Sequence, residues 1–281
     1  MEAGCFRSMR GGGLPTKTTT KICNEERLPK ARDLARELES VKDPLAVEEI
    51  DWSHDTATTF PELACKFTNI KRIKLHACAY TSLPPAFGSL EALESLEIDF
   101  CRLASLPPAF GNLQRLRRLN LMSNKLVSLP ERFTRLKTLD CLFLSFNGLV
   151  ALPEDFGDLE ALDFVSVAGN RLRSLPESFG KLARLTGCTL SWNPDLRSLP
   201  ASFANLVKLR WLEVKGIPGL ELGDSLARLK SLQYVYLDES QASSFPEKLK
   251  LALKSRGVKI SYEERIEDPY DDTYQTETRE L

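Results

Sequence analysis

The sequence repeats itself every 23 residues, and this period constrains the fold more than any other feature of the chain. Leucine is correspondingly abundant, at 47 of the 281 residues. A fixed period of this length indicates a solenoid, in which each unit covers the apolar face of its neighbour and no unit is stable alone. Six dipeptides ending in proline mark the period without insertion or deletion: Phe60-Pro61, Leu83-Pro84, Leu106-Pro107, Leu129-Pro130, Leu152-Pro153 and Leu175-Pro176.

Each unit also carries an apolar-x-apolar tripeptide. This pattern predicts a short strand whose two apolar residues point into the core while the residues between and beside them point outward. Ten such rungs follow one another along the chain, so we expect a stack of ten strands. The apolar pairs are Ile50/Trp52, Ile73/Leu75, Leu96/Ile98, Leu119/Leu121, Leu142/Leu144, Val165/Val167, Cys188/Leu190, Leu212/Val214, Val235/Leu237 and Val258/Ile260.

Three residues after each apolar pair the sequence favours a small polar or thiol side chain. An asparagine there can bond to backbone groups of the same and the next turn, which would otherwise be buried unpaired at a bend. The series breaks at Ile217, and we expect an irregular loop over residues 215–224. The residues in order are Asp55, Cys78, Cys101, Asn124, Asn147, Asn170, Asn193, Ile217 and Ser240.

Taken together, these residues resemble the leucine-rich repeat proteins over residues 45–262. The unit is similar to the 23-residue class found in Ras-suppressor and Erbin-like scaffolds, plant intracellular Ras-group proteins and some bacterial effectors. The resemblance implies an α/β solenoid with a concave parallel β-sheet, short helical or irregular convex segments and a helical N-terminal cap. It also implies a function in binding other proteins. The unit is clearest at Leu116, Leu119, Leu121, Asn124, Leu126, Leu129, Pro130 and Phe133.

The two ends of the chain differ in composition from the repeats. Residues 1–22 predict a disordered basic tail, and residues 23–46 an N-terminal capping helix with Leu34 and Leu38 at helical spacing. Residues 47–262 form the solenoid, with nine repeats and a terminal strand that follows a helix at 246–254. Residues 263–281 contain eight acidic residues and two arginines, which predicts an acidic disordered tail.

Composition narrows the possible partners and the compartment. The 38 Lys and Arg balance 39 Asp and Glu, which argues against nucleic-acid binding and against binding to a membrane surface through basic residues. No apolar stretch approaches the roughly 18 residues that a bilayer requires. Seven cysteines are an odd number, and the first residues contain no apolar signal-peptide core. We therefore expect a cytoplasmic monomer with a protein partner.

The outward side chains of the first rungs alternate in charge sign. Because adjacent strands lie about 4.8 Å apart, opposite charges on neighbouring rungs can pair. A ladder of surface ion pairs that satisfies itself is the favoured interpretation, and contact with a charged partner is the alternative. The charges are Glu49 and Asp51, then Lys71, Arg72 and Lys74, then Glu94, Glu97 and Asp99, then Arg117 and Arg118.

Aromatic residues fall into two sets. One phenylalanine per unit, four residues after the Leu of Leu-Pro, predicts a core spine of Phe87, Phe110, Phe133, Phe156, Phe179 and Phe203. A second set lies at outward positions from the fifth rung onward, with Phe100 as an outlier, and predicts a partner-binding strip. Gly169 and Gly187 lie between strip aromatics of neighbouring rungs and predict pockets. The strip residues are Phe143, Phe146, Phe164, Trp192, Trp211, Tyr234 and Tyr236.

The strip has an alternative interpretation, in which the acidic tail or another segment of the chain covers it. Catalysis has little support, because His54 and His76 are the only histidines and no nucleophile lies in a recognisable motif. We therefore predict a non-enzymatic recognition module or signalling scaffold with no cofactor, no metal and no catalytic residue. The alternatives are a bacterial-effector, ubiquitin-ligase or phosphatase accessory with a substrate-targeting repeat, or a stoichiometric enzyme inhibitor.

Overall fold

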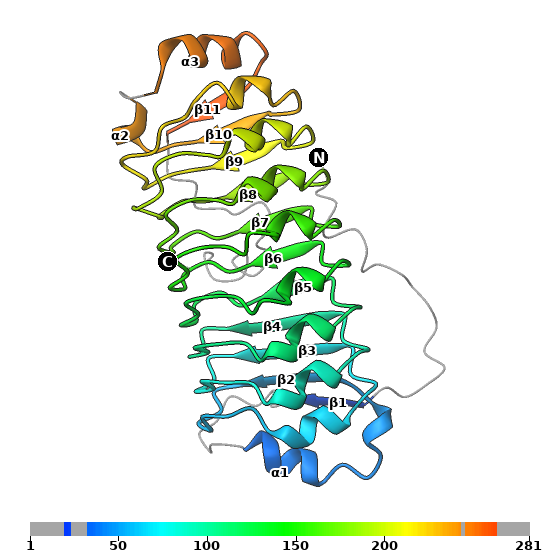
Figure 1. Ribbon diagram of the computed structural model, residues 1–281. Helices are drawn as coiled ribbons and strands as arrows, with labels where there is room; N and C mark the ends of the chain where they lie inside the picture. Colours follow the sequence, from blue (N-terminus) through cyan, green and yellow to red (C-terminus); the bar gives the residue numbers. More distant parts are fainter. Residues whose placement is uncertain (1–19, 24–32, 243–244, 263–281) are drawn as a thin grey trace, which may run out of the picture.

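The computed structural model describes residues 20–23, 33–242 and 245–262, and these form a stack of similar turns (Figure 1). Eleven parallel strands make one sheet in which every strand pairs with its neighbours in sequence order. The strands are β1 Thr20–Cys23, β2 Val47–Ser53, β3 Arg72–His76, β4 Ser95–Asp99, β5 Arg118–Asn120, β6 Cys141–Phe143, β7 Phe164–Ser166, β8 Gly187–Thr189, β9 Trp211–Glu213, β10 Tyr234–Tyr236 and β11 Lys259–Ser261.

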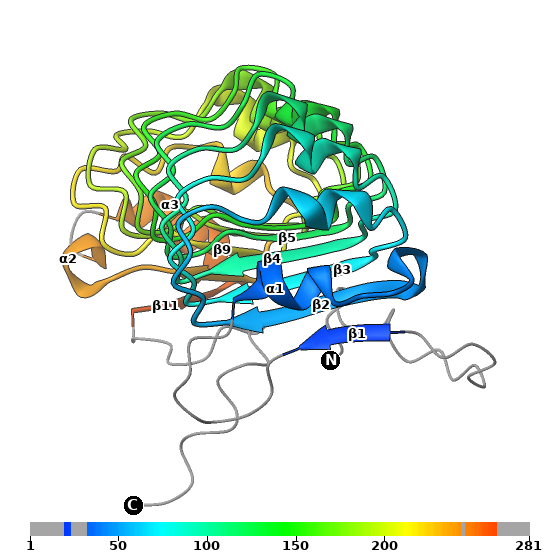
Figure 2. The same ribbon diagram turned by 90° about the horizontal axis from the view of Figure 1, so that it is seen from below.

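The opposite side of each turn is built from short 3₁₀ helices, so that sheet and helices face each other across the core (Figure 2). Neighbouring 3₁₀ helices approach closely: a Cβ added at Gly88 would lie 2.2 Å from the carbonyl oxygen of Ala109. The helices span Pro44–Ala46, Glu62–Lys66, Pro85–Ser89, Pro108–Asn112, Phe133–Arg135, Phe156–Asp158, Glu177–Lys181, Ala201–Asn205 and Leu226–Arg228.

One continuous hydrophobic core runs the length of the stack. The phenylalanine spine predicted from the sequence is confirmed, because all six side chains are fully buried. Their rings stack nearly parallel from unit to unit, with centroids 6.2 Å apart for Phe87 and Phe110 and 5.8 Å apart for Phe156 and Phe179. Each unit therefore completes the core of the next, as the period requires.

The asparagine row holds the turns together, but toward the preceding unit rather than the next one. The amide of Asn124 donates to the carbonyl oxygen of Leu121 in its own turn at 3.1 Å and to that of Ile98 in the preceding turn at 2.7 Å. Its side-chain oxygen accepts from the amide of Leu103 at 3.0 Å. Asn147, Asn170 and Asn193 repeat this pattern.

The row ends at the irregular loop that was expected over residues 215–224. Residues 215–224 form no strand or helix, and their only strand-like pairing is an isolated bridge from Glu221 to Ser198 of the preceding unit. Ile217 is fully buried at the position that asparagine occupies in other units, and its aliphatic side chain cannot form the hydrogen bonds to the backbone that asparagine forms. Gln241 in α2 (Glu239–Ala242) replaces the missing amide, since its Nε2 donates to the carbonyl oxygens of Val214 at 2.8 Å and Ile217 at 3.1 Å.

At the N-terminal end, the sheet is one strand longer than expected. Strand β1 pairs with β2, so residues 20–22 belong to the sheet and not to a tail, and Cys23 belongs to this strand and not to the helix expected over residues 23–46. Residues 1–19 and 24–32 lie outside the described part. Helix α1 (Leu34–Glu39) buries Leu34 and Leu38 in the core. Asp55, the first member of the asparagine row, accepts from the amide of Leu34 at 3.2 Å.

At the C-terminal end, helix α3 (Glu247–Lys254) and strand β11 form as predicted. Leu249 and Leu253 face the core, and β11 pairs with β10 in parallel register. Gly257 has a φ of 78°, which is the left-handed conformation typical of a residue that ends a helix. The acidic residues 263–281 lie outside the described residues.

Candidate functional site

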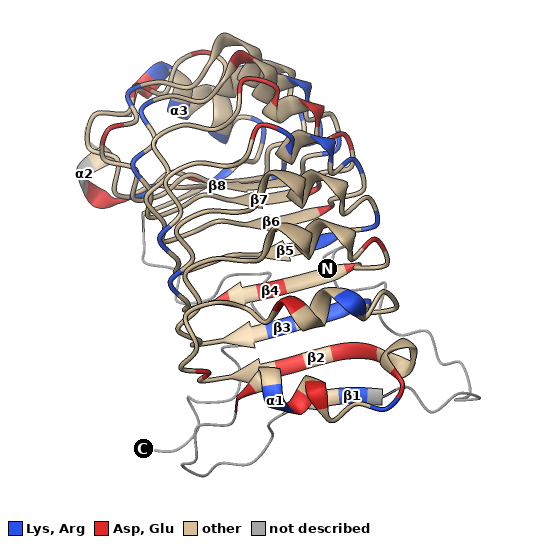
Figure 3. Cartoon of the chain, turned by 60° about the horizontal axis from the view of Figure 1, so that its bottom comes forward, with Lys and Arg blue, Asp and Glu red and all other residues tan. Residues whose placement is uncertain are grey.

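Basic and acidic residues lie on strands β1 to β4, the front half of the outward face (Figure 3), whereas outward positions of β6 to β10, the rear half, carry a cluster of aromatic residues. On β1 to β4 the charges alternate in sign from strand to strand and pair across the rungs. Lys21 lies 3.1 Å from Glu49 and 2.9 Å from Asp51, and Arg72 lies 2.7 Å from Glu49. The preferred interpretation of these charges, a ladder of ion pairs, is therefore confirmed from β1 to β3, whereas Asp99 on β4 contacts His76.

Two carboxyl groups of the front half respond differently to this environment. Burial alone would raise the pKa of Glu49, but hydrogen bonds from Arg72 and Lys21 outweigh it and lower that pKa. Burial raises the pKa of Glu97, and the charges of Lys74 and Arg118 oppose this only in part. The neighbouring cations thus outweigh burial at Glu49 and favour its charged form, whereas at Glu97 burial outweighs them.

The rear half holds a second hydrophobic cluster that is separate from the main core. Its buried members are Cys141, Phe164 and Trp211, with Phe143, Tyr234 and Tyr236 packed against them. The centroids of Phe143 and Phe164 are 5.3 Å apart, and those of Phe164 and Trp211 are 5.9 Å apart. We call these six residues the rear cluster.

The burial of Phe164 and Trp211 corrects the expectation that outward strand positions are exposed. Phe164 has no exposed surface and Trp211 only 7%. The pocket expected at Gly187 is also absent, because Phe164 and Trp211 contact each other across that rung and close the gap. Large rings two rungs apart can lean together where the strand between them lacks a side chain.

Phe146 and Trp192 belong to a different surface from the rear cluster. Both lie at the turn that follows a strand, have positive φ values of 55° and 59°, and are more than half exposed. The pocket expected at Gly169 is filled, since a Cβ there would lie 2.6 Å from the ring of Phe146. Of the seven predicted strip residues, the structure therefore brings five together in the rear cluster and places two at the edge of the sheet.

Two lysines join the rear half, and sequence reasoning missed both. Lys215 Nζ lies 5.7 Å from the centroid of Tyr236 and 3.7 Å from a carboxylate oxygen of Glu213. Lys259 Nζ lies 5.5 Å from the centroid of Tyr234. Strand register places Lys259 opposite Tyr234 and could have identified it, whereas Lys215 lies in the turn after β9. Lys259 is exposed and adds a cationic group to the rear half, whereas Lys215 is buried.

The described residues provide little chemistry for catalysis. His76 Nδ1 lies 3.0 Å from Asp99, and the rings of His54 and His76 are 6.1 Å apart, but no group of three or more potential metal ligands occurs among the described residues. The thiols of Cys78, Cys101 and Cys188 are buried and free. Burial raises the pKa of Cys188, which keeps its thiol protonated and unreactive.

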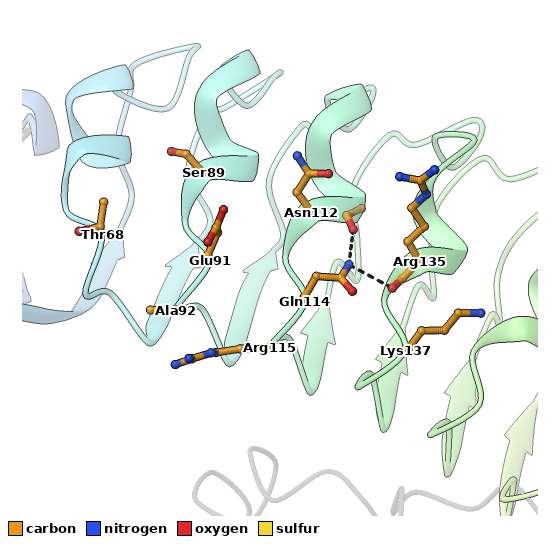
Figure 4. Close-up of a pocket in the computed structure, with 10 residues that line it drawn as sticks. Thr68, Ser89, Glu91, Ala92, Asn112, Gln114, Arg115, Arg135 and Lys137 are labelled. Carbon is orange, nitrogen blue, oxygen red and sulfur yellow. Dashed lines mark hydrogen bonds between the residues drawn. The ribbon is translucent and has the colours of Figure 1, made fainter.

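A hollow of about 990 Å³ lies away from both aromatic surfaces, beside the 3₁₀ helices of the front half (Figure 4). Gln114 crosses it and donates to the carbonyl oxygens of Gly111 at 2.6 Å and Arg135 at 3.1 Å. Its lining is polar and open, with Glu91, Arg115 and Lys137 among the side chains. No described helix is both long and apolar enough to cross a membrane.

Stacked 23-residue turns with an asparagine row and a parallel sheet define the class of solenoid to which the chain belongs. A family model described as leucine rich repeat matches residues 91–149 and 114–172. Residues 91–172 therefore match the leucine-rich repeat family, and the described sheet continues the same solenoid fold on both sides of them.

A solved structure shares this fold. The leucine-rich repeat domain of the type III effector XopL is 20% identical, with a TM-score of 0.61, over 76% of this chain and 75% of that one. A leucine-rich repeat protein of Leptospira interrogans is also 20% identical, over 78% of this chain and 84% of that one, with a TM-score of 0.42. No curated protein matches the sequence. The family match supports a protein-interaction module.

Proposed function

We propose that the protein is a non-enzymatic recognition module that binds a partner protein through the aromatic rear half of its concave face. The observation that carries this proposal is the rear cluster. Its residues lie outside the main core, which already buries the apolar faces of every unit. Aromatic residues grouped on an outward face are typical of protein interfaces.

The rigidity of the sheet supports the same function. Every strand of the described sheet is hydrogen-bonded to its neighbours, so Phe143, Tyr234 and Tyr236 occupy fixed positions on β6 and β10. Because these side chains are already held in place, this protein loses little conformational entropy when a partner docks on them. Tyrosines with a lysine beside the ring combine apolar area with polar specificity.

The test uses Phe143 and Tyr234, which are only partly buried and whose truncation should leave the solenoid folded. The full chain would be used to capture proteins from cells, and each captured protein would be titrated against wild type and against the Phe143→Ala/Tyr234→Ala variant. We expect dissociation constants to rise at least about 30-fold, equivalent to about 2 kcal/mol.

The matched control is Lys74→Ala, an exposed residue on β3 of the front half. We expect this variant to bind every captured partner as wild type does. Equal binding by wild type and by the folded Phe143→Ala/Tyr234→Ala variant would contradict the proposed face, and so would a loss of binding in Lys74→Ala. Circular dichroism of each variant would verify that the sheet is intact.

A further inference from the structure

The turn that follows each of strands β2 to β9 passes through one residue with positive φ, and these residues form a continuous row along the edge of the sheet. Their amides continue the rung-to-rung hydrogen bonds: Phe146 donates to the carbonyl oxygen of Ala168, and Trp192 to that of Lys215, both at 2.8 Å. The fold therefore uses this backbone conformation at eight successive units, from β2 to β9. The row is His54, Ala77, Phe100, Ser123, Phe146, Gly169, Trp192 and Gly216.

Three members of the row, Phe100, Phe146 and Trp192, are aromatic, although the conformation favours glycine. A bulky side chain with φ between 51° and 59° is strained, typically by about 1 kcal/mol or more. Core packing does not offset this cost, because the three side chains are 51%, 55% and 54% exposed. Glycines follow two of them: a Cβ at Gly216 would lie 2.3 Å from the ring of Trp192. Strain retained at exposed positions indicates a role outside the fold.

Basic side chains accompany the aromatic row. Two residues after the turn lie Arg102, Lys125 and Arg171, all exposed and stacked through backbone bonds such as Arg171 N to the carbonyl oxygen of Leu149 at 2.9 Å. In the stretches 100–106, 123–129, 146–152, 169–175 and 192–199 there are five basic residues and one acidic residue, Asp195. Across the described residues, no ion pair involves Arg102, Lys125, Arg171, Arg173 or Arg197.

Aliphatic surface completes this edge. Val127 and Val150, on neighbouring turns, are 59% and 49% exposed. We call the surface formed by the aromatic row, the basic residues and these two valines the exit edge, because the chain reaches it as each strand ends. It is distinct from the rear cluster, whose side chains project from the strands themselves.

We propose that the exit edge binds an extended acidic segment of a partner protein that carries aromatic or aliphatic side chains. Unpaired arginines and lysine supply the charge complement for the acidic groups. Phe146 and Trp192 are two rungs apart, roughly 10 Å at the spacing of sheet strands. This distance matches one turn of an extended polyproline II segment, about 9 Å for three residues, so every third side chain of the segment meets an aromatic residue.

The same features favour a peptide over a single-stranded nucleic acid. Bases that stack on successive aromatic residues follow one another at roughly 3.4 Å along an ordered strand, much less than the two-rung spacing. Exposed valines offer nothing to a phosphate backbone but do contact apolar side chains of a peptide. The two ligands are therefore separable by experiment.

The probe is a fluorescein-labelled peptide of repeated Glu-Glu-Tyr units, roughly 18 residues long and thus about 56 Å when extended. Its binding to the full chain would be followed by fluorescence anisotropy at about 50 mM and about 300 mM salt. We expect saturable binding that weakens with salt. A peptide of Glu-Glu-Ser units should bind at least about 10-fold more weakly, because it lacks the apolar side chains.

Two variants locate the binding. Phe146→Gly/Trp192→Gly removes the aromatic residues in favour of the residue that the turn prefers, so we expect the variant to be at least as stable as wild type and to bind the peptide at least about 10-fold more weakly. Ser123→Gly, at the same turn position, is the matched control and should bind normally. If the double variant fails to fold, Phe146→Asn/Trp192→Asn provides a second residue type that tolerates positive φ.

The charge requirement has its own matched pair. Arg171→Gln/Arg173→Gln should weaken binding at least about 5-fold and reduce its salt dependence. Arg115→Gln/Arg135→Gln removes the same net charge beside the 3₁₀ helices and should have no effect. The rear-cluster variant Phe143→Ala/Tyr234→Ala should also bind the peptide normally, so that the proposed function and this proposal can fail independently.

Three results would overturn the proposal. The first is equal binding of the peptide by wild type and by the folded Phe146→Gly/Trp192→Gly variant. The second is tighter binding of an oligothymidine of similar length than of the peptide. The third is peptide binding that appears only when the eight acidic residues of 263–281 are changed to their amides, because the chain's own acidic segment would then be the occupant.

Discussion

The front and rear halves of the concave face share one backbone and differ almost entirely in side-chain chemistry. In the front half, Arg72 occupies the strand position that Trp211 occupies in the rear half, and the same register links each to its neighbours. Arg72 pairs with Glu49, whereas Trp211 packs against Phe164 and Tyr236. A repeat backbone thus presents equivalent positions that can be used for charge or for apolar contact.

The energetic consequence of this difference is large. Ion pairs on a solvated sheet contribute under about 1 kcal/mol each, because water screens the charges and long side chains lose entropy. Burial of an aromatic side chain contributes several times more and is insensitive to salt. We therefore expect truncation to be costly at the buried aromatic residues of the rear half, Phe164 and Trp211, and to be tolerated well in the front half.

The largest effect is expected for Trp211→Ala. Removing a side chain that is only 7% exposed and packed between two aromatic rings leaves a cavity, and the free energy of unfolding should fall by about 3 kcal/mol. Arg72→Ala, at the equivalent front position, is the matched control and should cost under about 1 kcal/mol. Urea denaturation of both variants measures the difference. Similar losses of unfolding free energy in Trp211→Ala and Arg72→Ala would contradict the expected difference between the two halves.

A smaller effect is expected for Glu49→Gln. The pKa of Glu49 is lowered in the folded state, so its stabilisation is complete above the unfolded pKa, roughly 4.3, and is lost as pH falls through the folded pKa. The variant should therefore be less stable than wild type at pH 7, by under about 1 kcal/mol, and should approach wild type under more acidic conditions. High salt should reduce the difference at neutral pH. A deficit that persists in acid would indicate packing instead of charge.

The smallest effect, of opposite sign, is expected for Glu97→Gln. Burial raises the folded pKa of Glu97, so the carboxyl group favours the folded state below its unfolded pKa, and this contribution is lost as pH rises through the folded value. At pH 7 the Glu97→Gln variant should therefore have a higher free energy of unfolding than wild type, by roughly a few tenths of a kcal/mol. Thermal melts across the acidic range would detect convergence of the two proteins at low pH. Destabilisation at neutral pH would mean that Lys74 and Arg118 outweigh burial.

Much of the fold could be predicted because it is encoded locally and repeated. The phenylalanine spine follows from one position per 23 residues, and the irregular loop at 215–224 follows from Ile217 in place of asparagine. The extra strand β1 could not be predicted in this way, since Thr20–Cys23 lies outside the repeat. It belongs to the sheet because it pairs with the otherwise open edge of β2.

The candidate site was less predictable because side-chain direction depends on neighbours. The pleat correctly places Phe164 and Trp211 on the outward side of the core, yet it says nothing about whether their rings lean together over Gly187. Likewise, counting positions puts Phe146 and Trp192 near the strands, but their positive φ values turn them onto the exit edge. One set of seven residues therefore became two surfaces.

By itself, the sequence determined the period, the strand positions, the core spine and the alternation of charge in the front half, because each of these depends on a residue and its equivalent one unit away. Tertiary structure alone decided which outward aromatics are buried together, which remain exposed, and where Gln241 replaces a missing asparagine. These outcomes depend on contacts between units and on backbone torsions. No spacing in the sequence specifies them, since packing is settled only when the turns are stacked.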